Sequence, residues 1–556
     1  MNPFEQAVRD ALKTYVDERA TLEIPPDSSL GDYAFPCFSL AKTHKKNPVH
    51  IAQELAKAIK IDKHIERIEA KGPYLNFFVN RKLFIADTLK RIDKEKEKFG
   101  SGKKKKEHFM VEFCQANTHK AFHVGHLRGT LLGQALVNIL SYYGYPVKGV
   151  NYQGDIGAHV AKVIWYLDKF KEKPPKDHKG TWLGQIYQKA HKMIEEKAEY
   201  KEEVSGVLQK LESKDPDLTK IWEETRKYSL DEYEEYYQTL GIHFDEYFFE
   251  SEMEKPGKKL VDELIAKGVA EEDDGAIIIK LGELGNFLLL KSNGTALYST
   301  KDLALAKIKF EKFKIDYALY CVGSEQKLYF QQLFKTLEIM GFPQAKYCSH
   351  IPYELVTLQG GKISSREGEL LLLHQLLDTV INLAAEEVKK RHPEWDMEKI
   401  KENAEKIGLA ALKFTYLAYD NNKTIMFDIE KAMRFEGETG PYLQYVYARI
   451  QSILSQAPER TTPQHSLLQE PEEYEICKKM MRFEDVVKEA ATSYKPHLIA
   501  RYLIDLTQTF NEYYHKHRVL GDDQQLTEAR LCLIEAVQRV LANGLSLLGI
   551  ATMEQM

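Results

Sequence analysis

Two histidines stand at the start of a predicted helix, in the run THKAFHVGHLRGTLLGQALV. His123 and His126 flank Gly125, and Lys120 lies three positions before the first of them. Apolar residues at helical spacing follow this group, and the apolar run HFMVEF before it predicts a strand. A strand, a loop and a helix in this order place both imidazoles at a helix N-terminus, where α/β sheets bind anions. The pattern therefore predicts a phosphate site, in which Gly125 leaves room for a flat base against the backbone.

A second cluster of phosphate-directed residue types lies in GGKISSREG, residues 360–368. Lys362, Ser364, Ser365 and Arg366 bring an ammonium, two hydroxyls and a guanidinium into one short loop, which suits a triphosphate. Each motif alone has an ordinary explanation, a chance H-x-G-H in one case and a solvated hairpin turn in the other. Their occurrence together in one α/β domain favours a shared nucleotide site.

Composition limits the class of protein. The chain has 556 residues, 43% of them hydrophobic and 29% charged, which predicts two to four packed domains. Its net charge of −5 provides no overall basic field, although a local basic surface could still contact a nucleic acid. The six cysteines are scattered without a C-x-x-C pair, so neither a disulfide framework nor a zinc site is predicted. Because no apolar run approaches the ~18 residues of a membrane span, we expect a cytoplasmic protein with no membrane partner.

The order of the remaining strand and helix signals predicts how the site is positioned. Strand-like runs at residues 275–281, 286–292, 316–322 and 353–358 alternate with helical stretches, as expected of a parallel α/β sheet. A charged and helical stretch from about residue 168 to 250 interrupts this alternation. We interpret that stretch as an insertion between two halves of one α/β domain.

Other patterns lie before and after this domain. Residues 1 to about 98 combine helical patterns with one strand-like run, GPYLNFFVN, and end at GSGKKKK. We interpret the lysine run as a solvated hinge rather than an RNA contact. After about residue 400 the strand signals vanish, and apolar residues repeat every three to four positions, as one buried helix face requires. The C-terminal part is therefore predicted to be all-α.

The paired motifs resemble the HIGH and KMSKS signatures of class I aminoacyl-tRNA synthetases, and the sequence around them resembles the arginyl-tRNA synthetase family. The S-x-N-x-x-K-x-x-H-x-G-H-x-R segment of that family is similar to this sequence in register at Asn117, Lys120, His123, Gly125, His126 and Arg128. Further similar segments, such as NYQGDIGAHVA, GTALYSTKDLA and RFEGETGPYLQYVYARI, occur in order along nearly the whole chain. So many ordered matches exclude coincidence.

The resemblance implies a fold and an activity. The implied fold is a Rossmann-type parallel-sheet catalytic domain at residues 101–400, with its insertion at about 168–250. It is preceded by an N-terminal α+β domain at 1–100 that contacts the tRNA elbow, and followed by a C-terminal all-α helical bundle at 401–556 that binds the anticodon. The implied activity is arginine–tRNA ligation. The implied partners are L-arginine, ATP with its Mg²⁺ and tRNA specific for arginine, with no zinc and no protein-held metal; we expect a monomer.

The resemblance also implies roles for the two motifs. The implied ATP-binding residues are His123, Gly125, His126, Lys362, Ser364 and Ser365. His123, His126 and Lys362 would be catalytic, by stabilising an in-line displacement at the α-phosphate. Ser365 stands where KMSKS has its second lysine, so one cation of the signature is missing. In the family Lys120 would replace that cation as a fourth catalytic residue, the alternative being a plain surface lysine.

A guanidinium substrate demands an in-plane carboxylate and further hydrogen-bond acceptors. The resemblance implies that Glu112, Asn117, Tyr298, Asp302 and Gln326 bind arginine. Tyr298 and Asp302 are four positions apart, which places them on one helical face. The alternative is a hydrogen-bonded pair on the surface.

Several alternatives stay open at this point. Aromatic residues and one arginine at helical spacing in the C-terminal part suit either core packing or a stacking surface for unpaired bases; they are Tyr442, Tyr445, Tyr447 and Arg449. Two other functions also remain, an H-x-G-H nucleotidyl transferase that makes an adenylate without tRNA, and a non-catalytic tRNA-binding paralogue. The helical C-terminal part argues against the first, and the intact His123, His126 and Lys362 argue against the second.

Overall fold

The computed structural model describes residues 3–16, 21–25, 27–358, 371–459 and 461–556. The chain forms two compact units, which are described separately here. The first contains Met1–Phe99, Arg449–Phe483 and Asp505–Asn543, and the second contains Gly100–Ala448, Glu484–Ile504 and Gly544–Met556. No helix in the described part of the chain is both long and apolar enough to cross a membrane.

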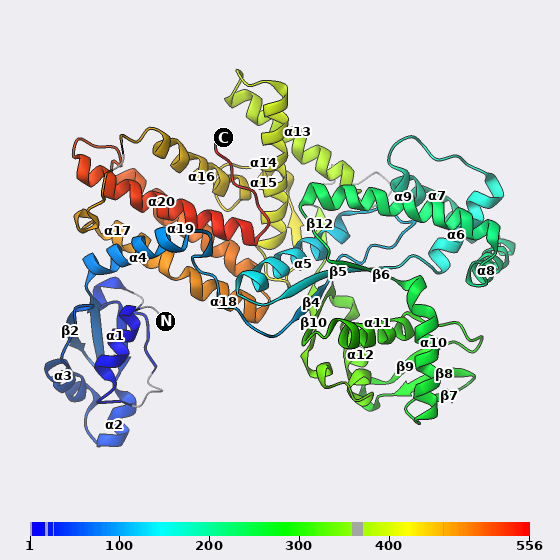
Figure 1. Cartoon of the computed structure of the whole chain (residues 1–556), viewed down its shortest axis with the longest axis horizontal. Coiled ribbons are helices and arrows are strands. Elements are labelled where there is room, and N and C mark those ends of the chain that lie inside the picture. Colours follow the sequence, from blue (N-terminus) through cyan, green and yellow to red (C-terminus); the bar gives the residue numbers. More distant parts are fainter. Residues whose placement is uncertain (1–2, 17–20, 26, 359–370, 460) are drawn as a thin grey trace. The chain divides into compact units, whose positions relative to one another are not determined.

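A five-stranded parallel sheet forms the centre of the second unit (Figure 1). Its strands lie in the order β11 (Cys348–Tyr353), β10 (Tyr317–Gly323), β4 (Phe109–Glu112), β5 (Val147–Gln153) and β6 (Glu246–Phe249). Chain order therefore reverses beside β4, and such a reversal opens a crevice at the carboxyl ends of the strands. Glu112, the last residue of β4, pairs with Val150 on one side and Tyr320 on the other. The expected α/β fold is confirmed.

Helices cover both faces of this sheet, as Figure 1 shows. Helix α5 (Val124–Tyr142) packs on β4, β5 and β10. One apolar core joins the other face to three helices and a small antiparallel sheet. These elements are α10 (Glu250–Ala266), α11 (Tyr298–Phe313), α12 (Lys327–Ile339), β7 (Glu271–Asp273), β8 (Ala276–Lys280) and β9 (Asn286–Leu290).

Three of the predicted strand signals form strands that lie outside the central parallel sheet. The signals at 275–281 and 286–292 form β8 and β9, which pair with each other in an antiparallel arrangement. The signal at 353–358 ends as β12 (Val356–Leu358), which pairs with β13 (Ile425–Phe427) in a separate parallel pair. An apolar run predicts a strand but contains no information about the strand beside it. Strand β13 also corrects the expectation that strands end before residue 400.

The charged stretch forms helices, as predicted. The chain runs from β5 to β6 through α6 (Ala158–Phe170), α7 (Lys179–Glu196), α8 (Glu199–Glu212) and α9 (Pro216–Leu240). Asp215 caps α9 by accepting backbone hydrogen bonds at its first turn, and Gly241 ends the helix with a positive φ. Aromatic residues supply much of the apolar face of α9, since Tyr233, Tyr236 and Tyr237 are buried.

Helices make up the rest of the second unit. They are α13 (Leu373–Arg391), α14 (Met397–Leu417), α15 (Ile429–Ala432), α18 (Phe483–Ser493) and parts of α16 (Gly440–Ser455) and α19 (His497–Lys516). The lysine run before β4 has no regular structure, but Lys105 is not a solvated side chain. Its ammonium lies 3.6 Å from the ring centroid of Tyr143 and donates to the carbonyl of that residue.

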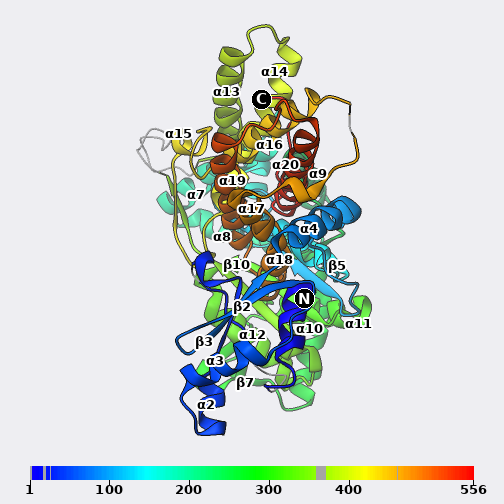
Figure 2. The same cartoon turned by 90° about the vertical axis from the view of Figure 1, so that its left-hand side faces the viewer.

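The first unit contains an antiparallel sheet with the order β1 (Tyr33–Pro36), β3 (Tyr74–Val79) and β2 (Ile65–Lys71). The sequence predicted only one of these strands, because β2 is a largely exposed strand without an apolar run. Figure 2 shows β2 and β3 beside α3 (Pro48–Ala58). The other helices that lie wholly in this unit are α1 (Pro3–Leu12), α2 (Phe38–His44), α4 (Arg81–Glu95), α17 (Pro471–Met481) and, apart from its last turn, α20 (Gln524–Leu547).

Candidate active site

The loop between β4 and α5 holds its backbone in a costly conformation. Three of its non-glycine residues, Cys114, Gln115 and His119, have φ values of 79°, 47° and 62°. Each such residue costs on the order of 1 kcal/mol or more, and strain of this kind concentrates at functional sites. The loop follows the switch point of the sheet, so the strain lies where α/β folds bind ligands.

Helix α9 holds this loop in place. The hydroxyl of Tyr233 donates to the carbonyls of Asn117 and Lys120, at 2.7 and 2.6 Å. The backbone N–H of His119 donates to Ser229, and its buried ring bonds the hydroxyls of Thr118 and Thr225. Burial lowers the pKa of His119 to about 3, so this ring is a neutral structural group. Helix α9, which belongs to the insertion, therefore holds the loop between β4 and α5 in place through these hydrogen bonds.

The two signature histidines form the N-terminal cap of α5. His123 is the N-cap residue, and its Nδ1 accepts from the backbone N–H of Gly125 at 3.1 Å. The Nδ1 of His126 accepts from the backbone N–H of His123 at 3.3 Å, which completes a capping box. The ring centroids lie 3.9 Å apart. Because each Nδ1 accepts a bond, each ring carries its proton on Nε2 and can donate it to a ligand.

The same histidines are neutral at physiological pH. Burial is the main cause that lowers the pKa of His123 to about 4, and that of His126 to about 3. The ammonium of Lys120 contributes to both shifts, so it lies within electrostatic range of both rings. The structure thus brings Lys120, His123 and His126 together at one helix N-terminus, as two N–H donors and one cation.

Two glycines let α5 approach its neighbours closely. A Cβ on Gly133 would lie 2.1 Å from the ring of Phe113, and one on Gly129 would lie 2.6 Å from the hydroxyl of Tyr353. A side chain at either position would push the helix away from the end of β4 or of β11. Small residues in α5 therefore fix how near the helix N-terminus lies to the switch point.

The GGKISSREG segment, with Lys362, Ser364, Ser365 and Arg366, lies outside the described residues. Both of its flanks are described, and both contact the signature segment. On the C-terminal side, Val124 donates to the carbonyl of Leu371, and Leu373 donates to the carbonyl of Phe122. On the N-terminal side, the guanidinium of Arg128 donates to backbone carbonyls just before β12 and just before β13. The described residues on either side of that segment are therefore bonded to the segment that holds His123 and His126.

Tyr152 marks a cluster of acidic residues beyond the carboxyl end of β4. Its hydroxyl is buried and has no hydrogen-bond partner in the described part of the chain. Burial, above all, and four nearby carboxyl groups raise the pKa of this phenol; the groups belong to Asp302, Glu250, Glu112 and Asp155. Such a concentration of negative charge needs compensating cations.

Three of these four carboxylates have their cation. The pairs are Glu112 with Lys309, Glu250 with Lys301 at 3.1 Å, and Asp155 with Arg226 at 2.8 Å. Asp302 has only the hydroxyl of Tyr329, and it makes no ion pair among the residues that the structure describes. Desolvation, above all, raises the pKa of Asp302 to about 8, with help from the charges of Glu112 and Glu250. Of these four carboxyl groups, Asp302 is therefore the one without an ion-pair partner among the described residues.

Tyr329 also links Asp302 to Tyr298. The ring centroids of Tyr298 and Tyr329 lie 4.8 Å apart, and the Tyr298 side chain is 54% exposed. Gln326 lies at the carboxyl end of β10, in the short 3-10 turn before α12. Asn117 lies beyond the end of β4, facing Gly154, where a Cβ would come within 2.1 Å of its Oδ1. The five residues expected to bind arginine thus all lie at or beside the carboxyl ends of the central strands or at the start of α11.

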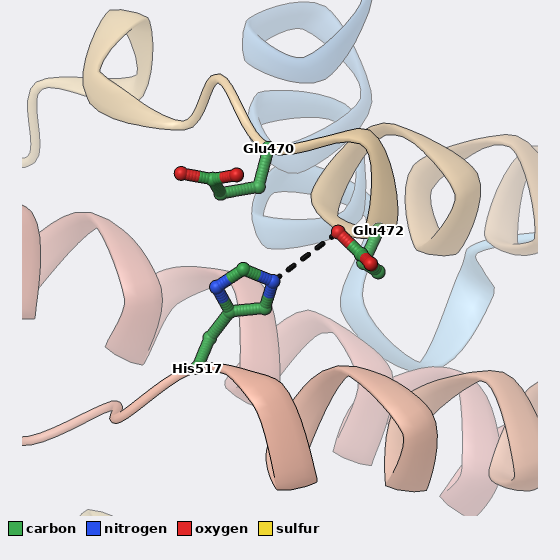
Figure 3. Close-up of side chains that lie close together, drawn as sticks. All are labelled: Glu470, Glu472 and His517. Carbon is green, nitrogen blue, oxygen red and sulfur yellow. Dashed lines mark hydrogen bonds and ion pairs between the residues drawn. The ribbon is translucent and has the colours of Figure 1, made fainter.

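Few side chains in the described part of the chain could hold a metal ion. The one group with suitable geometry is Glu470, Glu472 and His517 in the first unit (Figure 3). Glu472 already accepts from Lys516 at 2.8 Å and from His517 at 3.2 Å. These bonds, the lysine bond foremost, lower the pKa of Glu472 to about 2. The group is an ion-pair network with its own cation. None of the six cysteines belongs to it, and all six are free thiols.

Comparison with known proteins identifies the family. Models of three domains match the chain: the catalytic domain of class I (R) tRNA synthetases at residues 88–429, the DALR anticodon binding domain at 443–556, and the arginyl tRNA synthetase N terminal domain at 2–79. The first of these models covers more than half of the chain. The chain belongs to the class I arginyl-tRNA synthetase family.

Relatives in this family match over the full length. An arginine–tRNA ligase of Clostridium perfringens is 37% identical over 100% of both chains, and one of Halothermothrix orenii is 36% identical over 96% of this chain and 95% of its own. The arginyl-tRNA synthetase of Thermus thermophilus has a similar structure, with a TM-score of 0.84, 28% identity and 99% coverage of each chain. That of Plasmodium falciparum, at 21% identity, shares the fold with a TM-score of 0.79, over 100% of this chain and 98% of its own.

The roles of several residues in this arginyl-tRNA synthetase fold could not be predicted from the sequence. Lys309 and Tyr329 complete the acidic cluster, yet each lies in a helix whose periodicity marks it only as one residue of a face. Tyr233 of α9 and His119 of the loop are 114 residues apart in sequence, and the hydrogen bonds of both hold the loop against α9. No local signal could have revealed these partners. Arg128 did belong to the quoted segment, but its acceptors are backbone carbonyls, which no sequence pattern specifies.

Proposed function

We propose that this chain activates L-arginine with ATP and transfers it to the terminal adenosine of tRNA specific for arginine. The observation that carries the arginine assignment is that Asp302, a desolvated carboxyl group, has no ion-pair partner among the described residues, because a guanidinium brings one positive charge and a planar set of donors. Tyr298, Gln326 and Glu112 lie in the same region and add acceptors. The first step joins the arginine carboxylate to the α-phosphate of ATP, and pyrophosphate leaves.

The chain's own groups act by position and charge. The Nε2–H donors of His123 and His126 suit the oxygens of the α-phosphate, where negative charge accumulates in the transition state. Lys120 adds a cation beside them, and Lys362, with Ser364 and Ser365, is proposed for the phosphates that depart. Mg²⁺ is proposed to arrive bound to ATP, because Mg²⁺ is usually bound through substrate phosphates and one or two carboxylates. A hydroxyl of the terminal adenosine then attacks the arginyl carbonyl, and AMP leaves.

The wider organisation is also part of the proposal. Residues 1–100 contact the tRNA elbow, residues 101–400 catalyse, and residues 401–556 bind the anticodon. The enzyme acts as a monomer in the cytoplasm. The three domain matches support this order of domains, although the catalytic match runs to residue 429, and the six free cysteines are in keeping with a reducing compartment.

Aminoacylation of total tRNA with each amino acid in turn tests the proposal. We expect charging with arginine alone, and poor charging with lysine, whose ammonium cannot form two parallel bonds to a carboxylate. Citrulline is the matched probe, because its side chain has nearly the shape of arginine without the charge. Charging with citrulline as efficient as with arginine would contradict the proposed pairing of Asp302 with a positively charged side chain.

The same assay separates two other functions. An adenylate formed equally well without tRNA, with no transfer, would indicate a different nucleotidyl transferase. A folded protein that binds tRNA but charges none would indicate a non-catalytic paralogue.

A further inference from the structure

Two lysines of the second unit lie against one aromatic ring. The ammonium of Lys120 is 5.4 Å from the ring centroid of Tyr187, and that of Lys162 is 5.5 Å from the same centroid. Lys120 precedes the signature histidines, Lys162 lies in α6, and Tyr187 lies in α7 of the insertion. Three segments that are distant in sequence thus bring two like charges together.

Neither lysine of this pair has a carboxylate partner among the described residues. Two other lysines of α6 and α7 are ion-paired, since Lys169 lies 2.7 Å from Glu203 and Lys189 lies 3.0 Å from Glu172. Lys120 and Lys162 make no ion pair with any described carboxylate, and the polar partner of Lys162 is the Nδ1 of His191, at 3.3 Å. A ring face stabilises an ammonium by about 0.5–1 kcal/mol but leaves its charge uncompensated.

The surroundings of the pair are also basic. Burial lowers the pKa of Lys120, and the charge of Lys162 lowers it further. His159 lies within electrostatic range of both lysines, and burial and their charges are causes of its pKa of about 4. Like charges held together in a partly buried place are unfavourable unless an anion joins them. The pair therefore has the character of an anion site.

We propose that Lys120 and Lys162 form a two-lysine phosphate site that binds the triphosphate end of ATP, with Lys162 as a phosphate-directed residue that the signature motifs do not contain. The proposal rests on ATP being the substrate. The triphosphate is favoured over other phosphates because Lys120 lies within electrostatic range of both signature histidines, so the site is continuous with the α-phosphate donors. Lys162 would supply a second cation in a chain whose KISSR segment lacks the second lysine of KMSKS.

The experiment compares Lys162→Gln with Lys169→Gln, a change at another lysine of the same helix whose partner is Glu203. Arginine-dependent exchange of pyrophosphate into ATP, with saturating tRNA, gives KM values for ATP and arginine, and aminoacylation gives the KM for tRNA. We expect Lys162→Gln to raise the KM for ATP roughly 5- to 30-fold, because a charge-assisted hydrogen bond is lost. The KM values for arginine and tRNA should stay unchanged, and Lys169→Gln should alter none of the three.

Two further measurements sharpen the test. Lys162→Arg retains the charge and should keep the KM for ATP within about threefold of wild type. Because both lysines would face one ligand, the effects of Lys120→Ala and Lys162→Gln on ATP binding should be non-additive in the double variant.

Other results would overturn the assignment. A raised KM for tRNA with an unchanged KM for ATP would show that the phosphate belongs to the tRNA. No change in either KM would show that Lys162 is a solvated side chain. Calorimetric titration with inorganic tripolyphosphate is independent of arginine chemistry. If the wild type charged no arginine but bound tripolyphosphate more tightly than Lys162→Gln did, the proposed function would fail and the phosphate site would stand.

Discussion

The phenol of Tyr329 donates a hydrogen bond to the carboxyl of Asp302, which makes no ion pair with the cations of the described chain. The three neighbouring carboxylates each have a lysine or arginine, so Asp302 is the member that we propose for the substrate guanidinium. Its pKa of about 8 means that most of the free enzyme carries a neutral Asp302 at pH 7. In the proposed function arginine binds the carboxylate form, so its binding would release a proton.

The first prediction is a pH dependence of arginine binding. The pKa of Asp302 is raised, so the competent carboxylate form becomes more abundant as the pH rises toward 8. The KM for arginine should therefore fall roughly fivefold between pH 7 and pH 8 and level off above about 8.5. Initial rates at fixed ATP and tRNA measure this profile. A KM that is constant over this range would show that Asp302 is already ionised or does not contact arginine.

The second prediction concerns Asp302→Asn, which keeps the shape of the side chain and removes its charge. Loss of one member of a desolvated charge pair costs ~2–5 kcal/mol, so kcat/KM for arginine should fall by roughly 30-fold to several thousand-fold. The pH dependence of the arginine KM should vanish with it. Asp262→Asn, an exposed change in α10, is the matched control and should alter neither quantity.

The same substitution has an expected effect on stability with a definite sign. An aspartate ionises above about pH 4 in the unfolded chain, whereas Asp302 in the folded chain stays protonated up to a pKa of about 8. Between these values the unfolded state has bound fewer protons at this group, so Asp302 lowers stability as the pH rises. Asp302→Asn should raise the Tm more at pH 8 than at pH 4. Equal shifts at the two pH values would contradict the raised pKa.

The third prediction concerns the buried pair of Lys309 and Glu112. Both side chains are almost fully buried, at 1% and 6% exposure. Lys309→Met should lower the free energy of unfolding by ~3–5 kcal/mol, because it leaves Glu112 as an uncompensated buried charge. Adding Glu112→Gln should recover much of this loss. Urea unfolding of both single variants and the double variant gives the coupling energy, with exposed Lys312→Met as the control. Strictly additive losses would show that the two charges do not interact.

The sequence was informative where one local pattern decides the structure. The histidine pair follows a strand and caps a helix, as its spacing predicted, and the charged insertion is helical. The residues expected to bind arginine lie close to the switch point because the carboxyl ends of parallel strands meet at one edge of a sheet. Pairing of strands was less accessible. β8 and β9 have the same apolar composition as a central strand, and only their tertiary neighbours made them antiparallel.

Partners distant in sequence could not be predicted at all. Periodicity marks the buried face of a helix but does not say what covers it, and the helices after residue 400 are divided between the two units. In the second unit, Arg128 donates to the carbonyl of Lys423 and β12 pairs with β13, so both contacts cross residue 400. A truncation at residue 400 would remove these contacts along with any tRNA-binding surface. Single substitutions therefore test anticodon binding more cleanly than truncation.

The fourth prediction uses the division of labour within His123, whose Nδ1 caps α5 while its Nε2–H faces the site. Asn is a good N-cap residue and should keep the cap, but its side chain is too short to supply the second donor. His123→Asn should therefore leave the Tm nearly unchanged and lower the rate of adenylation by ~10²–10³-fold, with an unchanged KM for arginine. Because the pKa values of His123 and His126 are about 4 and 3, the wild-type rate should show no histidine titration between pH 6 and 8. Single-turnover kinetics measure the rate of adenylation and its dependence on pH. A titration near pH 6.5 in that profile would show that a charged imidazole takes part.

The last prediction concerns Arg128, a buried guanidinium whose acceptors are all backbone carbonyls. It donates to Lys423 at 2.7 Å, to Leu355 and Asn421 at 3.2 Å and to Asp420 at 3.4 Å, and it also bonds the carbonyl of Glu354. Carbonyl groups are neutral, so they do not compensate the charge of the guanidinium. They do hold this planar group against two loops at once, the one before β12 and the one before β13. A lysine has three donors on one nitrogen and cannot span both loops.

Arg128→Lys should therefore lower the free energy of unfolding by about 2–4 kcal/mol, since one or two buried carbonyls lose their donors. It should also lower the single-turnover rate of adenylation by roughly tenfold while the KM for arginine stays constant, because the displaced segment leads into GGKISSREG and not into the Asp302 pocket. Arg391→Lys, at a surface pair with Glu387, is the matched control and should change neither measurement. A variant that lost stability in urea but kept the wild-type adenylation rate would make Arg128 a purely structural residue. A raised KM for arginine would show that Arg128 acts on the Asp302 pocket instead.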